Sequence, residues 1–327
     1  LNYDYNKHFF LGHYFRDSYE DAVSSLPMIQ SDIRITRIEV WVTNTNRQPT
    51  NNREVIALMD LGENERARNS LLVRDPSISN NILDNSSTDL YDYIASQRNN
   101  LNTLDVNDKD LTNIRDYQIT NARLLTPNEY YYDTLLGYLT INRKLNADEV
   151  LGVAYEYSVN INGEVRNFKV GEFAFEKTGE VDETPPTLIV KMLKSSRVDP
   201  KYPMWDLMMK NIYSLNAFQM SRDEFMLNIF YQDPGGGAKR YIPEDGLEGL
   251  PLLEVLQLDN LNDYNQPYPN GFFDYIEGRT VVSNKGRLIF PVLEPFAGER
   301  EDPFGENSIS GIRTKSGIDS AIAEKYA

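Results

Sequence analysis

The clearest pattern in the chain is the alternation of apolar and polar side chains over residues 33–43. Val40 and the apolar residues two positions away face one side, whereas Trp41 and its polar neighbours face the other. Side chains of a β-strand alternate between two faces, so this run predicts a half-buried strand. Residues 44–52 are rich in Asn, Thr and Pro and predict a loop, and residues 53–60 return as an apolar run. We therefore expect these two runs to pair as a hairpin.

Short apolar runs bounded by turn residues predict most of the remaining secondary structure. Further strands are expected at residues 137–141, 150–159, 168–175, 187–193, 225–231, 239–242 and 287–293. Asn162 and Gly163 form a hairpin turn signal between two of them. Apolar residues at helical spacing predict one amphipathic helix within 203–213, with weaker helical patches at 91–97, 108–117 and 318–326.

These elements indicate a mainly β protein with β-sandwich-like sheets in two lobes, a few short helices and long irregular loops. The charged segment 178–186 ends in two prolines and is the best candidate for a lobe boundary. The predicted division is a β-rich lobe with long Asn/Asp-rich loops at residues 1–180, a second β-rich lobe at 181–300, and a polar tail with a short helix at 301–327.

Composition narrows the classes of function. The 327 residues carry a net charge of −16, which disfavours nucleic acid as a partner because binding to phosphates depends on Lys and Arg. The absence of cysteine excludes disulfides, zinc-thiolate sites and thiol nucleophiles. The 21 tyrosines favour strands and hydrated contact surfaces. The chain begins at Leu1 without an apolar leader, and we expect it to be a fragment of a longer protein.

Catalytic signals are weak, and the chain is predicted not to be an enzyme. His8 and His13 are the only histidines, and their separation of five residues matches no helix-borne zinc pair. No Gly-x-Ser-x-Gly motif frames a serine nucleophile. The glycine run 235–237 lacks the Gly-Lys-Ser/Thr ending of a phosphate-binding loop and predicts a turn. A glycosidase needs only two suitably spaced carboxylates, with Trp41 or Trp205 stacking on the sugar, and this alternative stays open.

One segment, residues 258–278, concentrates oxygen-bearing side chains. Calcium takes about six to eight oxygen ligands, and a loop of this composition can supply several of them. The candidate calcium ligands are Asp259, Asn262, Asp263, Asn265, Asp274 and Glu277. The alternative is an Asx-rich loop closed by its own hydrogen bonds to the backbone. No cofactor is required by the sequence, and calcium is the one candidate ion.

A series of sequence phrases, in a fixed order along nearly the whole chain, resembles a known family. The phrases are HFF at 8–10, YFRD at 14–17, ITRIEVWVTN at 35–44, ALMDLGE at 57–63, GYLTIN at 137–142, DEVLGVAYEY at 148–157, VGEF at 170–173 and FPVLEPF at 290–296. They resemble the SprA/Sov family of gliding-motility proteins, the outer-membrane translocons of the Bacteroidetes type IX secretion system. The phrases include no catalytic residue, so no site is carried over from the family.

The resemblance implies a very large outer-membrane β-barrel that passes folded cargo with C-terminal sorting domains to the cell surface. Its expected partners are a PorV-like protein, a periplasmic plug protein and the cargo itself. This chain lacks a series of lipid-facing alternating strands, so we expect a soluble insertion that caps or gates the channel. We favour the extracellular face of the outer membrane, with a periplasmic position as the alternative. The competing function is a calcium-stabilised, carbohydrate-binding β-sandwich of a surface adhesin.

Overall fold

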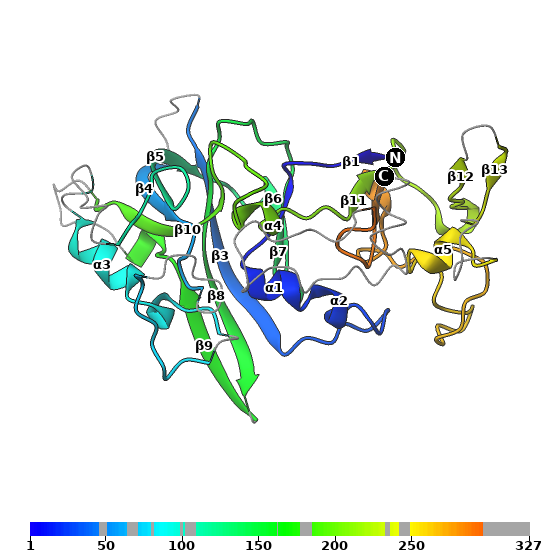
Figure 1. Cartoon of the computed structure of the whole chain (residues 1–327), viewed down its shortest axis with the longest axis horizontal. Helices are drawn as coiled ribbons and strands as arrows, with labels where there is room; N and C mark the ends of the chain where they lie inside the picture. The colour runs from blue at the N-terminus through cyan, green and yellow to red at the C-terminus, as the bar shows by residue number, and fades with distance from the viewer. Residues whose placement is uncertain are drawn as a thin grey trace. The chain divides into compact units, whose positions relative to one another are not determined.

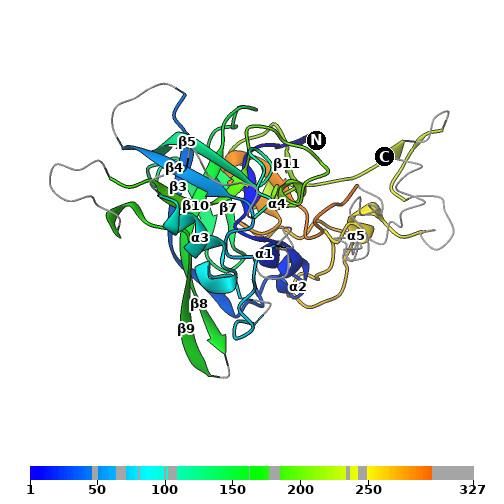
Figure 2. The same cartoon turned by 60° about the vertical axis from the view of Figure 1, so that its left-hand side comes forward.

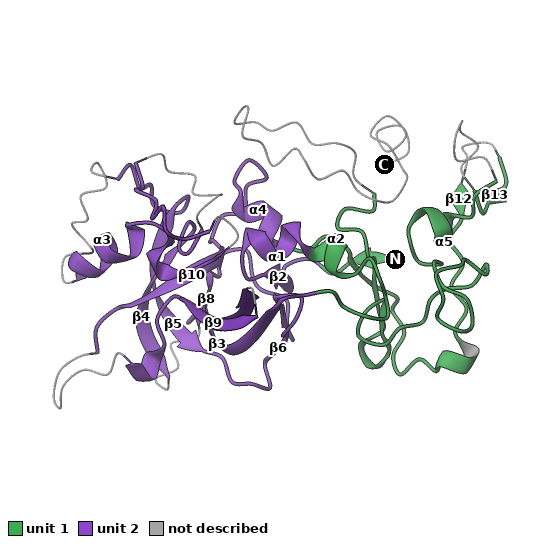
Figure 3. Cartoon of the chain, turned by 90° about the horizontal axis from the view of Figure 1, so that it is seen from below, with its two compact units in different colours: residues 1–4, 19–30, 209–327 green, residues 5–18, 31–208 purple. Residues whose placement is uncertain are grey.

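The computed structural model describes residues 1–45, 51–63, 71–79, 82–98, 101, 109–161, 163–176, 185–232, 236–241 and 249–296. The chain divides into two compact units (Figure 3). Unit 1 contains residues 1–4, 19–30 and the chain from 209 onward, whereas unit 2 contains residues 5–18 and 31–208. Among the described residues, no helix has both the length and the apolar character that crossing a membrane requires.

Unit 2 is organised around a closed ring of five strands (Figure 1). The strands are β3 (Ile33–Thr43), β4 (Asn52–Leu58), β5 (Tyr117–Leu124), β8 (Leu151–Ile161) and β10 (Leu188–Lys194). They pair in the order β10, β4, β5, β3, β8, and the start of β8 pairs with β10 to close the ring. The β4–β10 pair is parallel and the others are antiparallel. The prediction of a mainly β fold is confirmed.

The outer half of β8 extends beyond the ring and pairs with β9 (Glu164–Val170). Figures 1 and 2 show these two strands side by side as a long hairpin. Gly163 follows the turn with a φ of +88°, a conformation that glycine adopts readily, and its N–H donates to Asn160 Oδ1. The hairpin predicted from Asn162 and Gly163 is therefore confirmed.

Shorter elements complete unit 2. A three-stranded sheet joins β2 (His8–Phe10), β7 (Tyr138–Ile141) and β6 (Tyr130–Asp133). The helices are α1 (His13–Asp17), α3 (Leu90–Ser96) and α4 (Met204–Leu207), with 3-10 turns η1 (Asn85–Ser87) and η3 (Ala174–Glu176). The core includes β10, which is buried along its whole length, and the large side chains of Phe9, Tyr155 and Phe173.

Unit 1 contains mostly loops around a small antiparallel sheet. The sheet has the order β1 (Asn2–Tyr3), β11 (Ile212–Ser214), β15 (Arg287–Ile289) and β14 (Val281–Val282). The other elements are α2 (Tyr19–Ala22), η4 (Arg222–Glu224), β12 (Tyr231–Gln232), β13 (Ala238–Lys239), α5 (Leu252–Val255) and η5 (Ser283–Lys285). Its core packs Leu258, Leu288 and Phe290 with side chains from α5 and the residue after it.

Several predicted pairings and boundaries differ from the structure. The runs 33–43 and 53–60 form strands, but β5 lies between them, so the predicted hairpin is wrong. The predicted lobe boundary at 178–186 falls within unit 2, since β10 beyond it completes the ring, and residues 178–184 lie outside the described residues. The compact units therefore differ from the predicted lobes at 1–180 and 181–300, and the polar tail at 301–327 lies outside the described residues.

The predicted helices also have mixed outcomes. The patch at 91–97 is helical as α3, whereas the described part of 108–117 forms turns before β5. Within 203–213 the helix ends at Leu207, because Met208 is extended and forms a β-bridge with Phe9. Of the predicted strand 225–231, only Tyr231 lies in a strand, which continues to Gln232. The helix predicted at 318–326 lies outside the described residues.

Candidate functional site

The oxygen-rich loop of unit 1 follows α5, and its first carboxylate is used within the loop. Asp259 is 1% exposed, and its two carboxylate oxygens accept the backbone N–H groups of Asn270 and Gly271 at 2.9 and 2.8 Å. These hydrogen bonds join the start of the loop to a turn eleven residues later. A buried carboxylate satisfied by backbone donors is a structural feature that holds an irregular segment in place.

Asp274 forms the second half of this arrangement. Its Oδ2 accepts the backbone N–H of Asn260 at 2.6 Å. Burial raises the pKa of Asp274 to about 6, and the nearby charge of Asp259 adds to this effect, although hydrogen bonds from the backbone oppose it. Two carboxylates from opposite ends of the loop therefore lie close enough to repel each other.

Three of the other four predicted ligands accept hydrogen bonds within the loop or from its flank. Asn262 Oδ1 accepts the backbone N–H groups of Tyr264 and Gln266, while Asp263 Oδ1 accepts Asn270 Nδ2 at 3.0 Å. Asn265 has a left-handed φ of 58°, and Glu277 accepts the backbone N–H of Ser283. Asn270 therefore links Asp259 to Asp263, and Asp259 is also near enough to Asp274 to raise its pKa. Among the described residues, no group of three or more His, Asp or Glu side chains is placed to hold a metal ion.

A cavity of about 690 Å³ adjoins this loop within unit 1. Its lining comes from α2 and residues 23–28, from residues 257–274 of the loop, and from Pro291 and Val292. Ligand sites in proteins have volumes of roughly 300–1,000 Å³, so the cavity is large enough for a small molecule or a short peptide segment. Two of the predicted calcium ligands, Asn265 and Asp274, line it.

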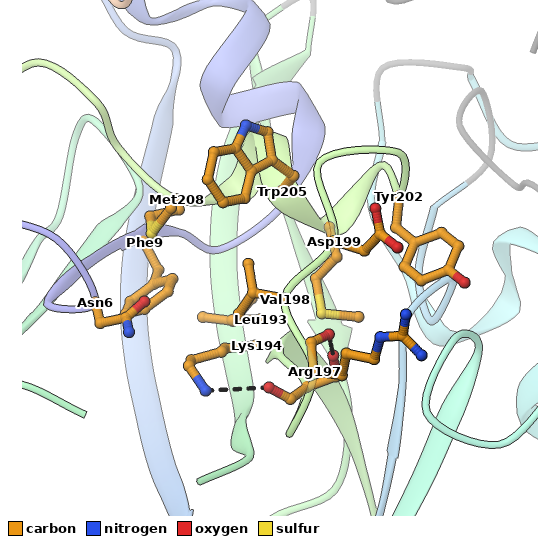
Figure 4. A pocket seen from close by; sticks show the side chains of 12 residues that line it. Asn6, Phe9, Leu193, Lys194, Arg197, Val198, Asp199, Tyr202, Trp205 and Met208 are labelled. Carbon is orange, nitrogen blue, oxygen red and sulfur yellow. Dashed lines mark hydrogen bonds between the residues drawn. The ribbon is translucent and has the colours of Figure 1, made fainter. Parts of the chain in front are cut away.

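Unit 2 has a much smaller cavity beside α4, shown in Figure 4, where Trp205 and Phe9 line it together with Lys194. Its volume of about 20 Å³ suffices for about one water molecule. The Lys194 ammonium donates to the carbonyl oxygens of Ala147, Glu149 and Ser195 at 2.9, 2.7 and 3.1 Å. Burial lowers the pKa of Lys194 to about 8. Its three donors are therefore used in joining chain segments.

The tryptophans proposed as sugar platforms are placed differently from that expectation. Trp41 is only 2% exposed within β3, so it cannot stack on a sugar ring and that part of the prediction is wrong. Trp205 lines the small cavity of unit 2, whose volume is far below that of a sugar-binding cleft.

Both histidines are buried in unit 2, where they take part in internal contacts. His8 Nδ1 lies 2.8 Å from Thr140 Oγ1. His13 Nδ1 lies 3.2 Å from Glu63 Oε1, and its Nε2 lies 2.9 Å from the Pro203 carbonyl oxygen. The interpretation of these residues as structural histidines agrees with their burial at 2% exposure.

The buried ion pair between Lys191 and Glu63 beside His13 was not predicted from the sequence. Lys191 Nζ lies 2.8 Å from Glu63 Oε1 and also donates to the Met59 carbonyl oxygen. Burial opposes ionisation of Glu63, but the positive charge of Lys191 and the contacts from His13 outweigh it and hold the pKa below its usual range. The available signal was a lysine inside the apolar run 188–194, since a buried lysine needs a partner.

Unit 1 also exposes a set of large apolar side chains, called here the exposed apolar set. Its members are Phe218, Met226, Phe230, Tyr264, Tyr268 and Phe272, each more than half exposed. Single exposed apolar residues are ordinary in folded proteins, and these six lie within 55 residues of sequence.

Comparison with known proteins adds no identification. No protein-family model matches the chain, and no curated protein matches it either.

Proposed function

We propose that this chain is a non-catalytic structural and interaction segment of a type IX secretion outer-membrane translocon, where it caps or gates the channel. The observation that carries the proposal is the ordered series of phrases that resemble the SprA/Sov family. Several of these phrases form buried framework: HFF is β2, ITRIEVWVTN covers most of β3, and DEVLGVAYEY leads into β8. Packing restricts which residue types fit at buried positions, so sequence similarity to the SprA/Sov family at these positions supports a similar fold.

The placement of reactive side chains supports an interaction role. The histidines, Glu63, Lys191 and Lys194 are each engaged in contacts inside unit 2. The exposed apolar set of unit 1 lies at the surface, and aromatic and methionine side chains of this kind are enriched in protein interfaces. The partners that this role implies are a PorV-like protein, a plug protein and cargo with C-terminal sorting domains. The proposed position is the cell outer membrane, on its extracellular face.

Two measurements in a Bacteroidetes host that carries the gene test this function. An antibody raised against the chain is expected to detect, in the outer-membrane fraction, a polypeptide several times longer than 327 residues. Deletion of the parent gene is expected to abolish gliding and to retain cargo with C-terminal sorting domains inside the cell. Normal cargo secretion by the deletion strain would refute the proposal. Selective glycan binding by the purified chain would favour the adhesin instead.

A surface variant tests the role of this segment within the parent protein. Phe218→Ser with Met226→Ser changes two members of the exposed apolar set, which are 75% and 74% exposed. We expect a normal level of the parent protein in the outer membrane and reduced cargo secretion. The matched control is Val165→Ser in unit 2, which is 70% exposed on β9. Equal secretion by both variants would argue against contacts through this surface.

A further inference from the structure

We infer that the cavity of unit 1 binds a peptide segment of a partner protein by accepting a lysine or arginine side chain. This inference is independent of the translocon proposal, since it rests on the cavity and its lining alone.

The lining is acidic. Two carboxylates, Glu20 and Asp274, contribute to it, and its other polar side chains are serines and the amides of Gln257, Asn260 and Asn265. Lysine, arginine and histidine do not occur among the sixteen lining residues. A cavity with carboxylates and neutral amides favours a cationic group over an anionic one.

The carboxylate of Asp274 retains capacity for such a group. It accepts the backbone N–H groups of Asn260 and Leu261, but each carboxylate oxygen has two lone pairs, so the group can accept further donors. Asp259 lies close enough to penalise the negative charge of Asp274. An incoming ammonium or guanidinium group would offset this repulsion, so the two acids favour a cation more strongly than one would.

The apolar lining residues suit the uncharged part of a basic peptide segment. Four of the sixteen lining residues are prolines, namely Pro27, Pro267, Pro269 and Pro291, and Leu26, Met28, Leu261 and Val292 add apolar surface. Proline has a fixed φ and no N–H, so it gives a stiff apolar wall that still offers carbonyl oxygens as acceptors. The aliphatic stem of a lysine or arginine can pack on such a wall while its charged end reaches a carboxylate.

The volume distinguishes a peptide from a bare ion. About 690 Å³ is far more than a metal ion occupies, and the described residues bring no third carboxylate or histidine to Asp259 and Asp274. The space accommodates one long side chain with its flanking residues. A basic peptide segment therefore accounts for the charge, the apolar walls and the size together.

The test uses the full chain and four defined probes, with binding followed by amide chemical shifts in NMR. The probes are n-butylguanidinium, n-butanol as its neutral control, the peptide acetyl-Ala-Pro-Lys-Pro-Ala-amide, and the same peptide with Glu in place of Lys. We expect saturable shifts at the amides of Asn260, Asn265 and Asp274 with the two cationic probes. Equal binding of n-butanol or of the Glu peptide, or no saturable shift at these amides, would overturn the inference.

A variant pair at the rim tests the electrostatic part. Met28 lines the cavity and is 71% exposed, so Met28→Lys should fold normally while placing a competing ammonium at the site. We expect it to weaken binding of the lysine peptide several-fold, whereas Met28→Leu retains the affinity of the natural chain. Unchanged affinity in Met28→Lys, with its amide spectrum otherwise preserved, would show that charge does not govern binding and would overturn the inference.

Discussion

Replacement of Lys191 by methionine is expected to destabilise unit 2 by about 3–5 kcal/mol, the cost of removing one partner of a buried ion pair. Lys191 is fully buried, and its ammonium lies 2.8 Å from Glu63 Oε1. Methionine fills a similar volume, so the cavity contribution is small. The loss comes from the Glu63 charge, which remains buried, and from the Met59 carbonyl, which loses this donor at about 1–3 kcal/mol.

The assay follows tryptophan fluorescence during urea unfolding. The chain has two tryptophans, Trp41 and Trp205, and both lie in unit 2, so their emission reports on this unit. Glu63→Gln removes the partner charge and still offers an oxygen to the His13 N–H. We expect the double variant Glu63→Gln with Lys191→Met to lose less free energy of unfolding than the two single variants added together.

The pH dependence supplies an independent check on the same pair. The pKa of Glu63 in the folded protein lies below its ordinary value of 4.5, so its contribution to stability is complete above that pH and is lost as the pH falls. Glu63→Gln should therefore reduce the acid sensitivity of unit 2 below pH 4.5. Two results would contradict a stabilising Glu63–Lys191 ion pair. One is a decrease of less than about 1 kcal/mol in the free energy of unfolding of Lys191→Met; the other is a double variant whose loss equals the sum of the two single losses.

The remaining predictions concern the protonation of Asp274, two glycine substitutions in unit 2, and the effect of calcium. The pKa of Asp274 is raised from 3.8 to about 6, so its protonation should stabilise unit 1 as the pH falls through 6. Hydrogen exchange at the Asn260 amide should therefore become slower over this pH range. Asp274→Asn should abolish this pH-dependent protection. Gly137→Ala should destabilise unit 2 by about 1–3 kcal/mol, because φ is +61° and the added carbon would lie 2.1 Å from the Phe15 ring, whereas Gly163→Ala at φ +88° meets open space and should cost less. Millimolar calcium should leave the melting temperature unchanged, because the loop carboxylates already accept N–H donors; an increase that Asp263→Ala with Asp274→Ala abolishes would instead favour the calcium site.

The existence of the main strands could be predicted from sequence because the signal is local. Alternation over 33–43 reflects the two faces of β3, and the turn signal at 162–163 correctly predicted that β8 and β9 pair as a hairpin. Helix α3 likewise follows from spacing within seven residues. Each of these features depends on residues that are neighbours along the chain.

Strand partners could not be predicted because they depend on distant residues. The sequence contains no local mark that β5, some sixty residues after β4, inserts between β3 and β4. The parallel contact of β4 with β10 joins segments more than 130 residues apart, so the predicted lobe boundary at 178–186 falls inside unit 2. The prolines at 185 and 186 break the local structure, and a break of this kind is compatible with either a loop or a boundary.

The same limit applies to the oxygen-rich loop. Composition identified Asp259 and Asp274, but the direction of each carboxylate depends on the turn at Asn270 and on the backbone at Asn260. The cavity beside them could not be predicted, since its lining combines residues near Pro27 with others more than 200 positions later. A loop whose Asn and Asp side chains accept hydrogen bonds from its own backbone has the same composition as a loop that binds an ion.

The two carboxylates of the oxygen-rich loop in unit 1 have different partners from three buried glutamates of unit 2, and this difference decides where an external cation is favoured. In unit 2, Glu63, Glu149 and Glu172 pair with Lys191, Arg143 and Arg98 at 2.8, 2.6 and 2.6 Å. In unit 1, the hydrogen bonds to Asp259 and Asp274 come from neutral backbone N–H groups, which hold the carboxylates in place without cancelling their charge. A cation entering unit 2 would compete with a positive charge already present, whereas at Asp274 it would reduce an existing repulsion.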